Sequence, residues 1–241
     1  MSNNKYPVLG AILNGNRATS PIISDKTMAD IDLQKIRQEY TQLSLDESEV
    51  NTNPFSQFQV WLAEAVKSEV KEPNAMSLAT VGSNGKPYNR IVLLKGFDES
   101  GFTFFTNHAS SKGDEIAANP NIAVCFFWIE LERQVRIEGV AEKLSREESE
   151  AYFKTRPHLS QIGAHASNQS KEVPNRAYLE EKFNTLAEKY EEGNVPMPET
   201  WGGYKVTPNY FEFWQGRRSR LHDRIVYSKE GSMWSIKRLS P

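Results

Sequence analysis

The sequence predicts a mainly β protein with peripheral helices (α+β), built around an antiparallel β-barrel. Short runs of β-branched and aromatic residues follow one another between residues 75 and 144, and few helical patterns separate them. The dipeptide Asn84-Gly85 between two such runs is strong hairpin chemistry. Several strands at close spacing with turn signals between them are typical of a barrel. We expect one domain over residues 31–241 and a flexible arm over residues 1–30, where Asn, Ser, Gly and Pro are frequent.

Composition excludes several classes of protein. The 241 residues carry a formal net charge of −2, so no overall basic field would attract nucleic acid or an anionic membrane. The single cysteine, Cys125, excludes a disulfide within the chain and fits a reducing, cytoplasmic compartment. It lies in the apolar run IAVCFFW, where we expect it to be a small buried hydrophobe. No apolar run reaches the ~20 residues of a membrane span, so we expect a soluble protein.

Two helices are predicted before the first strand, at residues 28–40 and from Pro54 onward. Asn53 can cap the second helix, and the fixed φ of Pro54 suits the first helical position. Apolar residues then recur at helical spacing and should pack into the core without any chemical role. They are Phe55, Phe58, Trp61, Leu62, Ala65 and Val66.

The predicted strands and later helices follow from periodicity and turn residues. The first two strands form a hairpin around Asn84-Gly85, and the third follows a turn at residues 98–101. Ser145 and Glu148 have the spacing of a capping box, and Pro157 should end the helix that they begin. The strands are 75–81, 88–95, 102–107, 121–128 and 133–144, and the helices are 111–118, 146–156 and 175–192.

The stretch EFWQGRRSRLHDRIVY, residues 212–227, holds the densest chemistry of the chain. We interpret residues 220–227 as a strand, in which Arg220, His222 and Arg224 would line one surface because alternate side chains share a face. Two guanidiniums beside an imidazole can bind an anion and move protons. Two alternatives remain: a strand kept soluble by its charges, and a nucleic-acid-binding module, which the acidic balance elsewhere disfavours.

Other chemical motifs are scarce. The four histidines are scattered along the chain and no metal-binding spacing is visible, so we expect no metal site. The GxSxG, GxGxxG and Walker patterns are absent, which removes serine hydrolase, Rossmann and P-loop chemistry as first interpretations. What remains is a set of dispersed basic and hydroxyl residues on strands. Such donors must converge from several segments to bind a phosphate.

The pattern EFWQG followed by RLHDR, at residues 212–216 and 220–224, resembles the C-terminal signature of the pyridoxamine (pyridoxine) 5′-phosphate oxidases. The closing RLSP is similar to the usual terminus of that family, and the resemblance covers roughly residues 36–241. It implies an FMN-binding split β-barrel and a homodimer with FMN at the interface. It also implies oxidation of pyridoxamine 5′-phosphate and pyridoxine 5′-phosphate to pyridoxal 5′-phosphate, with O2 as acceptor and H2O2 as product.

The resemblance also implies site residues. Those expected to hold FMN are Arg90, Ile91, Val92, Leu93, Leu94, Lys95, Phe105, Thr106, Ser111, Lys112, Gln134, Gln169, Ser170, Trp214 and Arg224. Those expected to bind the substrate are Arg37, Tyr40, Lys95, Tyr152, Arg156, Ser160, Arg220 and His222, and the last two are expected to be catalytic. On the predicted helix, Tyr152 and Arg156 are four residues apart, which places them on one face.

Two positions depart from the family pattern. Ser111 stands before Lys112 where the family usually has an arginine, so one phosphate-directed cation is missing. His165 stands where related chains often have a bulky aromatic residue. A rival from another class is a non-catalytic split-barrel protein that carries or senses FMN or pyridoxal phosphate. The presence of both Arg220 and His222 argues against it, because binding alone needs no imidazole.

Overall fold

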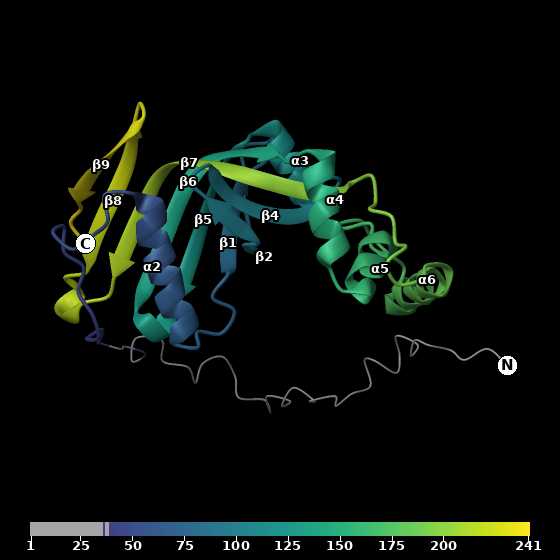
Figure 1. Cartoon of the computed structure of the whole chain (residues 1–241), viewed down its shortest axis with the longest axis horizontal. Coiled ribbons are helices and arrows are strands. Elements are labelled where there is room, and N and C mark those ends of the chain that lie inside the picture. The colour runs from purple at the N-terminus through teal and green to yellow at the C-terminus, as the bar shows by residue number, and fades with distance from the viewer. Residues whose placement is uncertain (1–35, 37–38) are drawn as a thin grey trace. The chain divides into compact units, whose positions relative to one another are not determined.

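The computed structural model describes residue 36 and residues 39–241 (Figure 1). It divides into two compact units, Glu39–Phe153 with Glu199–Pro241, and Lys154–Pro198, and each is described by itself. The expected arm and most of the helix expected at residues 28–40 lie outside the described residues. Ile36, Glu39 and Tyr40 are described and are not helical.

The larger unit contains one nine-stranded sheet in which every pair of neighbouring strands is antiparallel, as predicted. The strand order is β2-β1-β5-β6-β7-β4-β3, and β8 pairs with both β7 and β9. The bounds are β1 (Ala75–Val81), β2 (Pro87–Leu93), β3 (Gly96–Asp98), β4 (Gly101–Asn107), β5 (Asn121–Trp128), β6 (Arg133–Lys143), β7 (Trp201–Gln215), β8 (Asp223–Glu230) and β9 (Met233–Arg238).

The hairpin of β1 and β2 confirms the turn prediction. The two strands pair from Ala75 with Leu93 to Val81 with Pro87. Gly85 has φ +74, a left-handed conformation that glycine adopts without steric cost. The side chain of Asn84 accepts the N–H of Lys86 at 2.9 Å. Local turn chemistry therefore sets the register of this hairpin.

The long strand β7 joins the two halves of the sheet. Its first part, from Trp201 to Val206, pairs with β4, and its last part, from Tyr210 to Gln215, pairs with β8. From Tyr204 to Gln215 it also pairs with β6, with a register shift between Glu138 and Gly139. A Cβ at Gly139 would lie 2.3 Å from the carbonyl oxygen of Thr207, so only glycine fits there.

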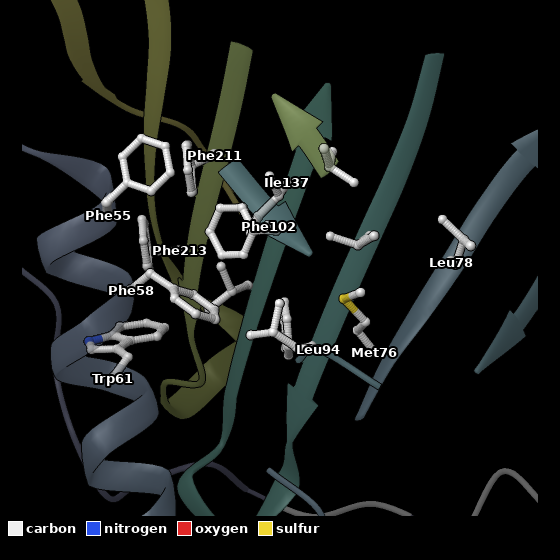
Figure 2. Packing of buried hydrophobic residues seen from close by; sticks show 14 of the residues in the cluster. Phe55, Phe58, Trp61, Met76, Leu78, Leu94, Phe102, Ile137, Phe211 and Phe213 are labelled. Atoms are coloured by element: carbon white, nitrogen blue, oxygen red, sulfur yellow. The ribbon is translucent and has the colours of Figure 1, made fainter. Parts of the chain in front are cut away.

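Helix α2 (Pro54–Lys67) covers the core of this unit. Asn53 caps it as predicted, and its Oδ1 accepts the N–H of Phe55 at 2.8 Å. Figure 2 shows Phe55, Phe58 and Trp61 pointing from α2 toward Phe102, Phe211 and Phe213 of the sheet. Of the six predicted core residues, four are buried and Leu62 is partly buried. Val66 is 60% exposed because it lies about 100° round the helix from buried Ala65, so its assignment to the core is wrong.

The other helices of the larger unit are close to the prediction. Helix α3 (Ser111–Ala118) has the predicted bounds, and α4 (Arg146–Thr155) ends one residue early. The capping box is confirmed, since Glu148 N–H donates to Ser145 Oγ at 3.1 Å and Ser145 N–H donates to Glu148 Oε2 at 3.0 Å. Cys125 is half-buried rather than buried, because it alternates with core residues along β5.

The smaller unit contains two helices. Helix α5 (His158–Ala166) was not predicted, and α6 (Arg176–Lys189) is shorter than the predicted 175–192 because Tyr190 already has an extended backbone. His165 lies on α5, and its Nε2 is 2.6 Å from the carbonyl oxygen of Pro196. This bond joins α5 to the chain after α6, so the histidine has a structural role here. Among the described residues, no helix has the length and apolar character needed to cross a membrane.

Candidate functional site

The connection between β7 and β8 corrects the strand predicted at residues 220–227. Ser219 and Arg220 have left-handed φ values of 57° and 61° within a 3₁₀ turn, and β8 begins only at Asp223. The register pairs Gln215 with Asp223, so the residues between them must reverse the chain and cannot form a strand. Arg220 and His222 therefore do not share a strand face with Arg224. The predicted strand is right only from Asp223 onward.

His222 is fixed by aromatic and polar contacts. Its half-buried ring lies 4.6 Å from the ring of Trp214 and 5.9 Å from that of Tyr40, measured between centroids. Its Nδ1 accepts the N–H of Arg217 at 3.1 Å. Burial, and then the charge of Arg220, hold the pKa of His222 below its usual range. At neutral pH the ring is therefore neutral, with its proton on Nε2.

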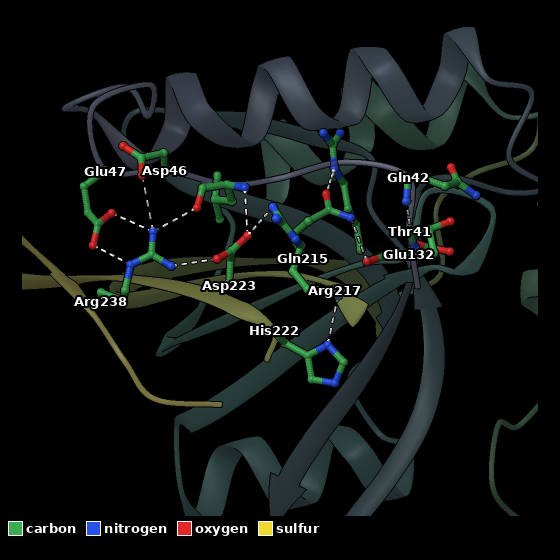
Figure 3. Close-up of polar contacts among 12 residues, drawn as sticks. Thr41, Gln42, Asp46, Glu47, Glu132, Gln215, Arg217, His222, Asp223 and Arg238 are labelled. Carbon is green, nitrogen blue, oxygen red and sulfur yellow. Dashed lines mark hydrogen bonds and ion pairs between the residues drawn. The ribbon is translucent and has the colours of Figure 1, made fainter. Parts of the chain in front are cut away.

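Asp223, next to His222, organises the surrounding loop (Figure 3). Its Oδ2 accepts from Arg217 Nη1 at 3.1 Å and from the backbone N–H of Leu45 at 3.1 Å. Its Oδ1 accepts from Arg238 Nη1 at 2.7 Å. The loop, the segment before α2 and strand β9 thus meet at one carboxylate. Sequence reasoning gave Asp223 no role, because its partner Leu45 is 178 positions away and reaches it only in the folded chain.

Three of the expected FMN residues lie in one row across the sheet. Gln134 of β6 pairs with Trp214 of β7, which pairs with Arg224 of β8. Directly opposite residues of antiparallel strands project from the same face. Since the ring of His222 packs against Trp214, the imidazole lies beside this row. The structure therefore brings three residues expected to hold FMN next to one residue expected to be catalytic.

Glu212 is a buried carboxylate that the sequence analysis left without a role. It is 2% exposed and accepts two hydrogen bonds from the guanidinium of Arg224, at 2.9 and 3.0 Å. Arg136 Nη1 donates to it at 3.0 Å, and the hydroxyl of Tyr210 lies at 3.3 Å. Its place in EFWQG could have indicated a role, because Glu212 is two residues before Trp214 on the same strand and so lies on the same face. Glu212 is thus the internal counterion of an expected cofactor residue.

Two of the expected phosphate-binding cations lie around one carboxylate. Arg90 donates to the hydroxyl of Thr80 and to Glu115, and Lys112 Nζ donates to Ser110 Oγ at 3.1 Å. Lys112 is only 8% exposed, and burial, followed by the charge of Arg90, lowers its pKa. The positive charges of Arg90 and Lys112 therefore gather near Glu115. This donor set suits an anion with several oxygens, such as a phosphate.

The rest of the RIVLLK segment has mixed exposure. Ile91 is 67% exposed and Lys95 is exposed, while Val92 and Leu93 are half-buried. Leu94 is 5% exposed and belongs to the core, so only its main chain is available to a ligand. Ser111 is exposed at the first position of α3 and precedes the buried Lys112.

Three nearly parallel aromatic rings hold another part of the expected site. Phe105 stacks on Tyr152 with centroids 3.9 Å apart at 15°, and on Trp201 at 5.4 Å and 10°. Thr106, the next residue on β4, is 7% exposed. Trp201 was not assigned to the site from the sequence, although it opens the Trp-Gly-Gly run that begins β7. The stack fixes the ring of Tyr152.

Some expected site residues belong to the smaller unit or lie outside the described residues. Arg37 lies outside them. Arg156 follows the last residue of α4, so its pairing with Tyr152 on one helix face stays a prediction. In the smaller unit, Gln161 Nε2 donates to the carbonyl oxygen of Arg156 at 2.8 Å. Three expected site residues there, Ser160, Gln169 and Ser170, are exposed.

A cavity of ≈ 610 Å³ borders the loop before β8. It lies between residues 40–44 on one side and residues 217–219 with Leu221 on the other, and Tyr40 forms part of its wall. A volume of this size suits a small-molecule ligand. Among the described residues, no group of three or more His, Cys, Asp or Glu side chains is placed to hold a metal ion. The arrangement therefore favours binding of an anionic organic molecule beside a neutral imidazole.

Comparison with known proteins gives consistent matches over most of the chain. Residues 62–190 match the family model "Pyridoxamine 5'-phosphate oxidase", and residues 201–241 match "Pyridoxine 5'-phosphate oxidase C-terminal dimerisation region". A pyridoxine/pyridoxamine 5′-phosphate oxidase of Cyanothece sp. is 50% identical over 88% of this chain and 99% of its own length. The pyridoxine/pyridoxamine 5′-phosphate oxidase of Burkholderia ambifaria is 54% identical over 87% of this chain and 99% of its own length.

Solved structures agree with the fold. PhzG from Burkholderia lata, in complex with tetrahydrophenazine-1-carboxylic acid, matches with a TM-score of 0.79 and 29% identity, over 85% of this chain and 100% of that one. A pyridoxamine 5′-phosphate oxidase-related, FMN-binding protein from Nostoc punctiforme matches with a TM-score of 0.63 and 18% identity, over 76% of this chain and 97% of that one. The second likeness concerns the fold alone.

Proposed function

Because this chain belongs to the pyridoxine/pyridoxamine 5′-phosphate oxidase family and is an oxidase of that kind, we propose that FMN is its cofactor and O2 its electron acceptor. The substrates are pyridoxamine 5′-phosphate and pyridoxine 5′-phosphate, the product is pyridoxal 5′-phosphate, and H2O2 is released. Two copies form a homodimer, which is supported by the match of residues 201–241 to the family's dimerisation region.

The residues present fit FMN chemically. Its phosphate needs cationic donors, and Arg90 and Lys112, which lie near Glu115, would supply them. The row of Gln134, Trp214 and Arg224 offers an amide, an aromatic face and a charged fork on one face of the sheet. When bound, FMN supplies the chemistry of accepting a hydride. Phe105, Thr106, Gln169 and Ser170 remain part of the proposed cofactor set.

The protein's share of the reaction is orientation and placement of charge and protons. His222 accepts the N–H of Arg217 at Nδ1, so in the neutral ring Nε2 carries the proton and can donate it in a hydrogen bond to a substrate oxygen or nitrogen. Arg220 lies in the same loop, and burial together with its positive charge lowers the pKa of His222 and keeps the ring neutral. The two side chains would together hold the substrate ring while its C4′ carbon is oxidised.

The substrate's 5′-phosphate is assigned to a second set of donors. Lys95 and Tyr152 belong to the larger unit, and stacking on Phe105 fixes the ring of Tyr152. Arg156 and Ser160 complete the proposed set. Binding through several charged hydrogen bonds makes the phosphate a requirement, so unphosphorylated pyridoxine should be a poor substrate.

One observation carries the proposal: the imidazole of His222 is neutral and held in place against Trp214. Trp214 in turn pairs with Arg224, an expected FMN residue, in the row across the sheet. A protein that only carried or sensed FMN would not need it. The test is to purify the protein, record a flavin spectrum, identify the released flavin, and measure H2O2 formation from pyridoxine 5′-phosphate. FMN release with turnover is expected. A yellow protein without turnover would favour the carrier, and a colourless protein that takes up no FMN would exclude the cofactor.

A further inference from the structure

Residues 39–51, here called the strap, have no helix or strand and are held by partners far away in the sequence. The backbone N–H groups of Thr41 and Gln42 donate to the carboxylate of Glu132 at 2.8 and 3.1 Å. Further along, the N–H of Leu45 donates to Asp223, and its carbonyl oxygen accepts from Arg238 at 3.0 Å. Figure 3 shows these contacts converging on the strap from the sheet.

Glu132 joins the strap to the end of β7. It is 8% exposed and occupies a left-handed position, φ 54°, between a 3₁₀ turn and β6. While its Oε2 holds the strap, its own carbonyl oxygen accepts the N–H of Gly216 at 2.7 Å and the side-chain amide of Gln215 at 3.2 Å. Glu132 thus holds both the strap, about 90 positions before it in the chain, and the end of β7, more than 80 positions after it. A carboxylate that accepts backbone N–H groups makes stronger bonds than a neutral acceptor.

The strap bond sets the place of Tyr40, the residue immediately before Thr41. The ring of Tyr40 lies edge-on to Trp214 at 5.7 Å and 89°, and 5.9 Å from the ring of His222. It packs directly over Gly216, where an added Cβ would lie 2.6 Å from Cγ of Tyr40. The absence of a side chain at Gly216 therefore permits this contact. A shift of the strap at Thr41 would move Tyr40 away from the imidazole.

We propose that Glu132 is a positioning residue of the oxidase: its carboxylate fixes the strap so that Tyr40 lies against His222 and Trp214 at the substrate site. The inference rests on the proposed function, because that function places the substrate at His222. Glu132 touches neither ring and acts through Tyr40. A glutamine at this position keeps an oxygen acceptor for the two N–H groups, whereas an alanine removes it.

The first test follows the strap itself, in the FMN-loaded protein, by hydrogen–deuterium exchange with residue-level mass spectrometry. In Glu132→Ala we expect the amides of Thr41 and Gln42 to exchange at least about tenfold faster, because their acceptor is gone. The amide of Leu45 should stay protected, because Asp223 holds it. Glu132→Gln should behave like the wild type. The matched control is Glu130→Ala, which removes an exposed carboxylate two residues away.

The second test follows the substrate. Glu132→Ala should raise KM for pyridoxine 5′-phosphate about tenfold and change kcat less. Glu132→Gln should keep KM close to the wild-type value, because it keeps an oxygen acceptor for the strap. In a Tyr40→Ala background, Glu132→Ala should add almost nothing, because the effect passes through Tyr40. A role limited to stability would instead lower the melting temperature and leave KM unchanged.

Two results would overturn the inference. One is normal protection of the Thr41 and Gln42 amides in Glu132→Ala. The other is a KM effect of the same size with and without Tyr40. If the wild type did not oxidise the substrate at all, the proposed function would fail. The exchange experiment would then still decide whether Glu132 holds the strap.

Discussion

Glu212 holds Arg224 with both carboxylate oxygens: Oε1 accepts from Nε at 2.9 Å and Oε2 from Nη2 at 3.0 Å. The bond raises the pKa of Arg224, and Glu212 is buried at 2% exposure. The two residues belong to the two halves of the sequence signature, EFWQG and RLHDR. Strand pairing of β7 with β8 brings these halves together, so the glutamate of one half orients the last arginine of the other.

Glu212→Ala should be strongly destabilising, because it leaves the guanidiniums of Arg224 and Arg136 without their shared buried partner. The arginines are partly exposed, so the loss should be about 1–3 kcal/mol, the cost of leaving buried donors without their acceptor. Urea unfolding measures the loss, and FMN affinity should fall in parallel. The matched control is Glu138→Ala, which removes the half-exposed second partner of Arg136 and should change stability by less than about 1 kcal/mol. Equal effects of the two substitutions would contradict the assigned role.

His222→Ala and Arg220→Ala should lower kcat/KM and leave the flavin spectrum nearly unchanged, because neither side chain is proposed to hold FMN. Arg224→Ala should instead cost mainly FMN affinity. Steady-state kinetics and FMN titration of the three variants separate the effects. If the pattern were reversed, the proposed division between substrate and cofactor residues would be wrong.

The reaction should depend on pH through His222. Burial and the charge of Arg220 hold its pKa below the ordinary value of 6.5, and its neutral form accepts the N–H of Arg217. The unfolded chain therefore binds a proton at higher pH than the folded chain does. The stability that neutral His222 contributes is present above pH 6.5 and is lost as the pH falls through the lower, folded pKa.

We therefore expect the midpoint of the acid limb of kcat/KM for pyridoxine 5′-phosphate to lie below pH 6.5. The stability difference between the wild type and His222→Asn should shrink over the same range. The measurements are a pH–rate profile and urea unfolding at several pH values. Activity that falls as the pH rises through about 6.5 would instead show that His222 acts in its charged form.

Ser111→Arg should tighten FMN binding by about 1 kcal/mol, or fivefold, because it adds a cation next to Lys112. The gain should shrink at high salt, because Ser111 is exposed. Quenching of FMN fluorescence measures the affinity. The matched control, Ala117→Arg, adds the same charge at an exposed position at the other end of α3. No gain at low salt, or an equal gain in the control, would show that Ser111 does not face the phosphate.

Asn53→Ala should lower the free energy of unfolding by about 1 kcal/mol, because it removes the acceptor of the Phe55 N–H at the start of α2. Val66→Ala is the control in the same helix. Its side chain is 60% exposed, so the change should be within about 0.5 kcal/mol. Thermal or urea unfolding distinguishes the two. A large effect of Val66→Ala would indicate an interface that covers this face of α2.

The sequence by itself determined the elements whose cause is local. The turn at Asn84-Gly85, the cap at Asn53 and the capping box of Ser145 and Glu148 each depend on residues a few positions apart, and all are confirmed. The alternation of apolar residues and the turn residues between them predicted strands β1, β2, β4, β5 and β6. The signature at residues 212–224 gave the family, because its residue types are read without any knowledge of their contacts.

Only the tertiary structure decided how the signature residues are arranged. The periodicity of residues 220–227 predicts a strand, but the pairing of Gln215 with Asp223 forces the chain between them to turn. Glu132 and Asp223 received no role from the sequence because their partners in the strap are 91 and 178 positions away. Local propensity contains no information about such partners. The bonds exist only because the folded sheet brings these segments to the same place.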